Sequence, residues 1–237
     1  MMYLLYGNPI LIAAAVIPAV FLLVQVNKAD KLDKEPAGLL ISLVIQGIIS
    51  TALAVITERL GTALLDSLWD ESSLAYRLCM YFIVVGLSEE GFKYLLLKRR
   101  TWYSPDFNCQ FDGVVYAVCV ALGFALWENI GYVVMYGFGT ALVRAVTAVP
   151  GHACFGVFMG AFYGMARRCA NYGYERASRN CRRLAVVVPI VLHGFYDFIA
   201  SSEAGSSEWV FLVFVAVLFL ITSRMVKRLS RTDQYID

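Results

Sequence analysis

One apolar stretch of this chain carries charges that an ordinary membrane-spanning helix does not tolerate. Residues 74–97 are long enough to cross a bilayer at about 1.5 Å per residue. They nevertheless contain two adjacent carboxylates, Glu89 and Glu90, followed by Lys93. A charge at membrane depth costs between about 2.5 and 17 kcal/mol. The segment must therefore pair its charges internally, contribute to a polar site inside a bundle of helices, or do both.

The composition indicates an integral membrane protein. The chain has 237 residues, of which 59% are hydrophobic and 16% charged, whereas soluble domains have about 45–50% apolar and 25% charged residues. We expect an all-α, polytopic bundle of about seven transmembrane helices that forms a single domain over residues 1–237, surrounded by the lipid bilayer and without a nucleic-acid partner. The apolar segments are residues 4–26, 38–60, 74–97, 111–136, 140–166, 184–201 and 208–227.

The basic residues fall in alternate links between these segments. Lysines and arginines occupy the first, third and fifth links and the C-terminal tail, while the second, fourth and sixth contain none. The positive-inside rule then predicts an N-terminus outside the cell and a cytoplasmic C-terminus. Glu58-Arg59 is expected near the outer end of the second helix. The short link at residues 137–139 predicts an antiparallel hairpin of the fourth and fifth helices.

The two histidines of the chain both lie inside predicted helices. His152 is expected near the middle of the fifth segment and His193 in the sixth, at a depth similar to that of Glu89, while Glu128 is expected nearer the outer side. Ionisable groups at this depth are rare and usually functional. The sequence therefore predicts a shared polar site to which several helices contribute.

Helical spacing adds detail to this site. Glu89 and Lys93 are four residues apart and share a helix face, from which Glu90 is turned by about 100°. His193 and Asp197 have the same spacing, so the carboxylate can orient the imidazole. In the fifth segment, His152 and the glycines at 156, 160 and 164 form one row that allows close approach of another helix. Pro150 is expected to bend that helix.

Carboxylates and imidazoles offer two routes to peptide-bond hydrolysis. In one, His152 and His193 bind zinc with Glu128 or Asp197 as a third ligand, and Glu89 or Glu90 accepts a proton from the activated water. In the other, no metal is present, and a glutamate activates water while the histidines polarise the carbonyl. The chain contains no His-Glu-x-x-His motif, so both routes remain open. It also lacks Gly-x-Ser-x-Gly, which argues against a serine nucleophile.

The order of these motifs resembles a known family. The motifs are Glu89-Glu90-x-x-Lys93, Phe124-x-x-x-Glu128-Asn129, His152 in a later helix, and His193-x-x-x-Asp197. They are similar to those of the PrsW family of intramembrane proteases, a relative of the CAAX prenyl endopeptidases and bacteriocin-processing enzymes. The first link, residues 30–36, also resembles the first cytoplasmic loop of that family.

The resemblance implies an activity and a site within residues 86–200. Glu89 and Glu90, with His152 and His193, would be catalytic, while Lys93, Glu128, Asn129 and Asp197 would support them. The implied substrate is a single-pass membrane protein in the bacterial cytoplasmic membrane, namely an anti-sigma factor that receives its first cut. The prenyl endopeptidases have Asn at the position of Asp197, and because a carboxylate is the better zinc ligand, zinc remains possible.

Two functions other than proteolysis use the same groups. A proton-coupled transporter would arrange Glu, His and Asp side chains as a relay, but would spread them along the membrane normal. A non-catalytic scaffold that binds a partner helix would not need both Glu89 and Glu90. The clustering at one depth and the presence of both glutamates favour the protease.

Overall fold

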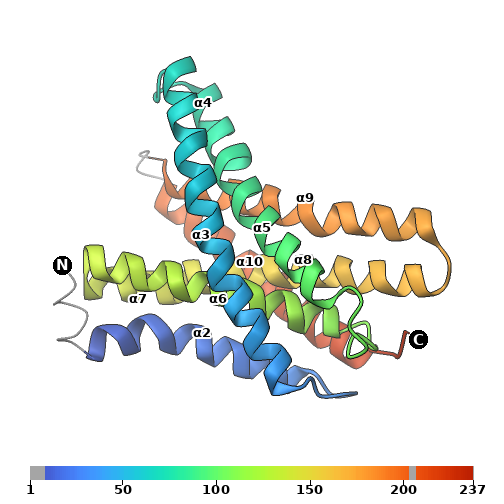
Figure 1. Ribbon diagram of the computed structural model, residues 1–237. Coiled ribbons are helices and arrows are strands. Elements are labelled where there is room, and N and C mark those ends of the chain that lie inside the picture. The colour runs from blue at the N-terminus through green and yellow to red at the C-terminus, as the bar shows by residue number, and fades with distance from the viewer. Residues whose placement is uncertain (1–8, 203–206, 237) are drawn as a thin grey trace.

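Apolar runs separated by short polar links form helices here, because a helix satisfies its own backbone hydrogen bonds where no water is present. The computed structural model describes residues 9–202 and 207–236 (Figure 1). The helices are α2 (Pro9–Ala29), α3 (Ala37–Leu68), α4 (Leu74–Leu78), η1 (Cys79–Gly86), α5 (Leu87–Thr101), α6 (Asp112–Tyr136), α7 (Phe138–Val146), α8 (Ala148–Asn171), α9 (Glu175–Ala200) and α10 (Ser207–Arg231).

The predicted polytopic helical fold is confirmed. Within the described residues, six helical runs are long and apolar enough to cross a membrane. The remaining predicted segment, residues 74–97, corresponds to α4, η1 and α5, which follow one another without a gap. The first predicted segment begins at residue 4, and its residues 4–8 lie outside the described part of the chain.

Two helices, α3 and α9, extend farthest beyond their predicted bounds. α3 continues past Glu58-Arg59 to Leu68, because both residues are good helix formers and the residues after them include no proline. Its 32 residues span about 48 Å, more than the roughly 30 Å of a bilayer core, so the helix must tilt or project. α9 begins at Glu175, nine residues before the predicted start at residue 184, with an arginine-rich first half.

The predicted fifth helix is interrupted near its beginning. Gly137, with a φ of 84°, links α6 directly to α7. The helix then breaks at Thr147, and α8 starts at Ala148. Pro150 therefore lies in the first turn of α8, where a missing N–H costs nothing, and does not bend a continuous helix as predicted. His152 consequently belongs to the second turn of α8 and not to the middle of a helix.

The centre of the bundle is α6. Every residue of its first half, from Asp112 to Ala125, is buried, as expected for a helix surrounded by others. It packs against α2, α3 and α8. The predicted close approach along the glycine row of α8 is confirmed, since a Cβ on Gly160 would come within 2.4 Å of the Gly113 oxygen in α6. A Cβ on Gly164 would be 2.1 Å from the Gln110 oxygen.

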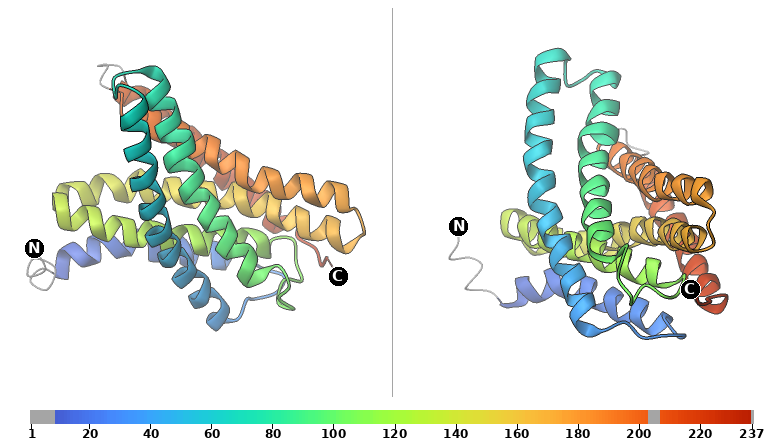
Figure 2. Two further views of the ribbon diagram at one scale, coloured as in Figure 1. Left: turned by 45° about the horizontal axis from the view of Figure 1, so that its top comes forward. Right: turned by 45° about the vertical axis from the view of Figure 1, so that its right-hand side comes forward.

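Two hairpins flank this centre. α3 packs along η1 and α5, and Figure 2 shows this pair rising at a large angle from the layer that contains α6 and α8. α8 and α9 form the second hairpin, which turns at Gly173 with a φ of 78°. The polar site described below lies where the two hairpins meet α6.

Most basic residues gather at one end of the bundle, called here the basic end, which contains residues 28–36, 98–111, 167–183 and 224–236. Its segments contact one another. Asn108 Nδ2 donates to Asp33 Oδ2 at 2.9 Å, and Arg168 Nη1 donates to Gln110 at 3.2 Å. The C-terminal tail pairs with the link before α6, where the Ile236 N–H donates to the Asn108 oxygen at 2.8 Å.

Buried carboxylates accompany the basic residues at this end. Asp30 is 1% exposed and Glu35 is 9% exposed. Asp233 is an acidic neighbour of Asp30, while Asp106 and Asp112 are acidic neighbours of Glu35. Burial raises the pKa of Asp30 to about 6 and the pKa of Glu35 to about 7. The folded protein therefore keeps protons that the unfolded chain releases at lower pH.

We expect the protein to lose stability as the pH rises from about 4.5 to 7. The pKa of Glu35 is higher in the folded state than in the unfolded chain, so folding is favoured at low pH and less favoured once Glu35 must ionise. The substitution Glu35→Gln should flatten this dependence and add about 1–3 kcal/mol of relative stability at pH 8. Melting curves in detergent between pH 5 and 8 measure the effect. A pH profile that is identical in the variant would contradict it.

Candidate active site

The charged pair lies directly after a short π-helix. The eight residues of η1 form wider turns than an α-helix, a conformation that is rare and often found at functional sites. η1 packs closely on α9, since a Cβ on Gly194 would come within 2.5 Å of the Phe82 ring. α5 continues from η1 and brings Glu89 and Glu90 inward, where they are 6% and 0% exposed.

Lys93 bridges both glutamates. Its ammonium lies 3.1 Å from Glu89 Oε2 and 2.7 Å from Glu90 Oε1, and the side chain is buried. The sequence placed Glu90 on another face, but residues three apart on a helix are also neighbours, so one lysine reaches both carboxylates. The same ammonium lies 3.8 Å from the centre of the Phe124 ring in α6. The charges inside the bundle are thus partly neutralised by an internal cation.

His193 of α9 lies between the glutamate pair and Asp197. Its Nδ1 is 2.9 Å from Glu90 Oε1 and 3.8 Å from Glu89 Oε2, and its Nε2 is 3.4 Å from Asp197 Oδ2. The ring stacks on Phe155 of α8 with centroids 4.9 Å apart. These contacts hold the imidazole in one orientation beside the glutamate pair, and the predicted pairing of His193 with Asp197 is present.

His152 of α8 connects Lys93 to α6. Its Nδ1 lies 3.2 Å from the Lys93 ammonium and its Nε2 lies 2.9 Å from Glu128 Oε2. An ammonium only donates hydrogen bonds, so Nδ1 must accept, and the ring proton is on Nε2, which donates to Glu128. The ring centroids of His152 and His193 are 5.3 Å apart.

Arg144 of α7 belongs to the same network and was not identified from the sequence. It donates to Glu128 Oε2 at 2.8 Å and to Asn129 Oδ1 at 3.1 Å. Asn129 in turn donates to the Ala15 oxygen at 2.9 Å, which ties the network to α2. Because the link after α6 is a single glycine, α7 folds back along α6 and brings the arginine to Glu128. The sequence does contain a signal for this role, namely a single arginine near the start of the apolar segment at residues 140–166.

The structure therefore brings together all the site residues that the sequence proposed. The catalytic candidates Glu89, Glu90, His152 and His193 are buried, and one ligand atom of each lies within 4.8 Å of those of the other three. Lys93, Glu128, Asn129 and Asp197 contact this group or its neighbours. Their joint position supports the predicted shared site, while the role of each residue remains a prediction.

A cavity of about 400 Å³ leads to this group. Glu89, His152 and His193 line it together with Tyr81 and Ser201. Tyr81 and Ser201 lie farther from the basic end, because η1–α5 ends there and α9 begins there. His193 and Ser201 are eight residues apart on α9, which is about 12 Å along the axis. Glu90 does not line the cavity and lies behind Glu89. The two adjacent glutamates thus have different access to a ligand.

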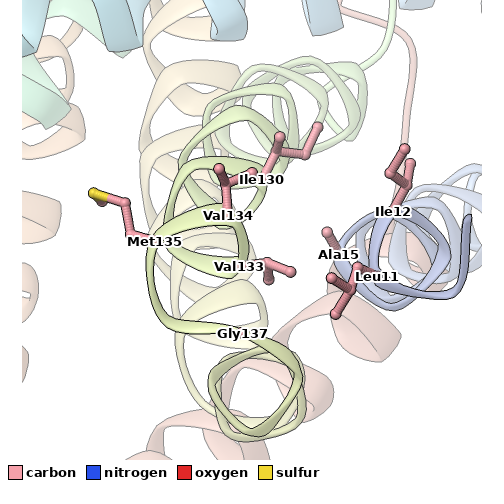
Figure 3. Close-up of a pocket in the computed structure, with 8 residues that line it drawn as sticks. All are labelled: Leu11, Ile12, Ala15, Ile130, Val133, Val134, Met135 and Gly137. Atoms are coloured by element: carbon pink, nitrogen blue, oxygen red, sulfur yellow. The ribbon is translucent and has the colours of Figure 1, made fainter. Parts of the chain in front are cut away.

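A second pocket has no connection with this chemistry. It has a volume of about 250 Å³ and lies between α2 and α6, where aliphatic side chains such as Leu11, Ala15 and Val133 point toward one another (Figure 3). None of the catalytic candidates lines it. The carboxylate and imidazole groups therefore identify the 400 Å³ cavity as the candidate active site.

The donor set at the cavity's inner end fits a metal ion. Two imidazoles and two carboxylates converge there, the donor types that zinc takes in hydrolases. Glu90 Oε2 is buried and has no hydrogen-bond donor within the described part of the chain, so it can coordinate without losing a partner. Glu128 lies outside this set, because its Oε2 already accepts hydrogen bonds from His152 and Arg144.

Comparison with known proteins agrees with this site. Residues 35–222 match the family described as "PrsW family intramembrane metalloprotease". The chain is 32% identical to Protease PrsW of Oceanobacillus iheyensis over 220 residues, which cover 92% of this chain and 95% of that protein. The identity to Protease PrsW of Bacillus subtilis is 30% over 210 residues (89% and 90%), and to that of Clostridioides difficile 31% over 231 residues (94% and 90%). No solved structure gives a significant match.

Proposed function

The chain belongs to the PrsW family of intramembrane proteases, and on that premise we propose that it uses Glu89 to activate water against a peptide bond of a single-pass membrane protein. One observation carries this proposal, namely the convergence of Glu89, Glu90, His152 and His193 at the inner end of the cavity. A protein substrate and a multi-pass location in the bacterial membrane follow from the family. The transporter and scaffold alternatives lose their support.

The two glutamates have separate roles in this proposal. Glu89 lines the cavity and can reach a bound water, so it is the general base. Glu90 is fully buried and faces Lys93 and His193, so it holds these two side chains in place. Lys93 lowers the free-energy cost of burying the two carboxylates at membrane depth, because its ammonium contacts both of them.

The metal form of the reaction is the one that the donor set favours. Glu90, His152 and His193 would hold zinc in the His₂Glu arrangement known from soluble hydrolases. When bound, such a metal acts as a Lewis acid toward the carbonyl oxygen and the attacking water. Glu128 then orients His152 through its Nε2–H, and Asp197 orients His193. The sequence proposed Glu128 as a ligand, and its existing hydrogen bonds favour the orienting role instead.

The position of the cavity supports a first cut near the outer face of the membrane. Its far part is lined by Tyr81 and Ser201, at the end of the bundle opposite the basic end. If the basic end is cytoplasmic, as the positive-inside rule predicts, the part of the cavity next to Tyr81 and Ser201 lies toward the outer side of the membrane. We therefore propose a membrane-anchored substrate cut close to that face, and the family resemblance makes an anti-sigma factor the expected one.

Elemental analysis combined with a cleavage assay tests the metal. We expect the purified protein to bind about one zinc ion per chain, and His193→Ala or His152→Ala to abolish this binding. A chelator should stop the cleavage of single-pass proteins in reconstituted vesicles, followed by mass spectrometry of new N-termini, and zinc should restore it. Full activity of metal-free protein would overturn the metal assignment and leave a glutamate mechanism without metal.

A further inference from the structure

Glu58 of α3 is an acidic residue of the catalytic cavity that the reaction does not use. It lines the same cavity as Glu89, Glu128 and Asp197. The sequence predicted only that Glu58 would mark the end of its helix. Because α3 continues for ten more residues to Leu68, Glu58 lies about 15 Å inside that end of the helix. Its carboxylate therefore belongs to the wall of the site and not to the membrane surface.

The other carboxylates of the cavity have partners inside the protein. Glu89 contacts Lys93, Glu128 accepts from Arg144 and His152, and Asp197 faces His193. Glu58 differs from them, because its Oε1 is buried and has no hydrogen-bond donor within the described residues. A buried polar atom without a partner costs about 1–3 kcal/mol. The atom is thus available for a donor that arrives with a ligand.

The charge of the cavity indicates what kind of donor this is. Glu58, Glu89, Glu128 and Asp197 line it, while Arg144 is the one lysine or arginine side chain among the lining residues. Arg144 already binds Glu128, and its guanidinium lies 3.9 Å from the Tyr132 ring. Even with Lys93, which contacts Glu89, acidic side chains at this wall outnumber basic ones, an arrangement that favours a cation over an anion.

Tyrosine rings favour a long basic side chain as that cation. Tyr81, Tyr132 and Tyr196 line the cavity together with Glu58. Aromatic faces bind both the alkyl stem and the charged head of lysine and arginine. A basic residue near the end of a transmembrane segment can also reach toward water, so it can enter from the open part of the cavity.

We propose that Glu58 is a specificity-determining residue that binds a lysine or arginine side chain of the substrate close to the bond that is cut. The inference rests on the proposed protease function and adds a chemical class of substrate to it. The salt bridge forms inside the cavity, which Glu58 and Glu89 line together. It places the substrate segment against α3 and leaves Glu89 free to act as base.

Cleavage-site profiling tests the subsite. The protein is reconstituted in vesicles with a bacterial membrane-protein extract, and new N-termini are identified by mass spectrometry. We expect lysine or arginine to be enriched within a few residues of the cut. Glu58→Gln should lower kcat/KM for a single-pass peptide that contains the basic residue by about 30-fold or more, mainly through KM, with little change for the same peptide carrying alanine.

Charge reversal provides the sharper version of the test. Glu58→Lys should prefer an otherwise identical peptide with glutamate at the basic position, while the matched control Glu71→Lys, in the exposed link before α4, should keep the original preference. If Glu58→Lys does not fold, the Glu58→Gln comparison decides alone. An unchanged residue preference in the folded Glu58 variants overturns the subsite but not the protease. No cleavage at all by the unaltered protein overturns the proposed function and the subsite with it.

Discussion

Glu89→Gln is expected to lower the rate of peptide-bond cleavage by a factor of about 10² to 10⁴, which is the usual contribution of a general base. Glutamine has nearly the same shape and can still accept a hydrogen bond from Lys93, whose ammonium lies 3.1 Å from Glu89 Oε2. It cannot take a proton from water. The variant should therefore fold and bind substrate normally. The measurement is kcat for a single-pass peptide in vesicles, together with the melting temperature.

Glu90→Gln should behave differently, and the contrast identifies the base. Glu90 is fully buried behind Glu89 and accepts from both Lys93 and His193. Its replacement should lower the melting temperature as well as the activity, because a buried charged network loses one member. Glu71→Gln, in an exposed link, is the control that should change neither. Full activity of Glu89→Gln would exclude Glu89 as the base, and equal activity loss with unchanged stability in both variants would leave the two roles indistinct.

The second large effect is expected from Lys93→Met. This substitution removes the cation that lies 3.1 Å from Glu89 and 2.7 Å from Glu90, and it leaves two buried carboxylates side by side. Breaking a buried ion pair in this way costs about 3–5 kcal/mol. We therefore expect a strongly lowered melting temperature in the presence of a chelator, measured in detergent by fluorescence.

Zinc should rescue this variant more than it stabilises the unaltered protein. Lys93 contacts two of the proposed zinc ligands, Glu90 through Oε1 and His152 through Nδ1, so the ammonium and a metal ion bring positive charge to the same residues. Without the lysine, a divalent ion can supply the missing positive charge. Lys31→Met, at an exposed position of the basic end, is the control. A Lys93→Met protein that is as stable as the original with chelator present would show that the carboxylate pair does not depend on the lysine.

Most of the fold follows from local properties of the sequence. The number and order of the membrane segments depend on stretches of apolar residues, and their length is a property of the chain itself. Helix ends were predicted less well, since the arginine-rich start of α9 and the polar pair Glu58-Arg59 resemble boundaries although both are helical. The π-helix of η1 and the break at Thr147 depend on packing against α9 and α6, which no short sequence window contains.

Some residues of the candidate site could likewise be identified from the sequence, while others could be found only in the tertiary structure. The motifs of Glu89, His152 and His193 could be recognised because charges and histidines stand out in apolar helices and because their order matches a family. Arg144 and Glu58 were not assigned, since a single charge without a motif has no marked partner in the sequence. Their roles depend on α7 folding back along α6 and on α3 extending beside the cavity.

The residues alone therefore predict that this chain spans a membrane and that its glutamates and histidines share a polar site inside the bundle. The sequence does not distinguish the two adjacent glutamates, because their spacing to Lys93 allows both to bind it. Only the packing of α5 against α9 turns Glu89 toward the cavity and Glu90 toward His193. The same packing leaves one Glu58 oxygen unpaired at the cavity wall, because burial and access are properties of helices in contact and not of a single helix.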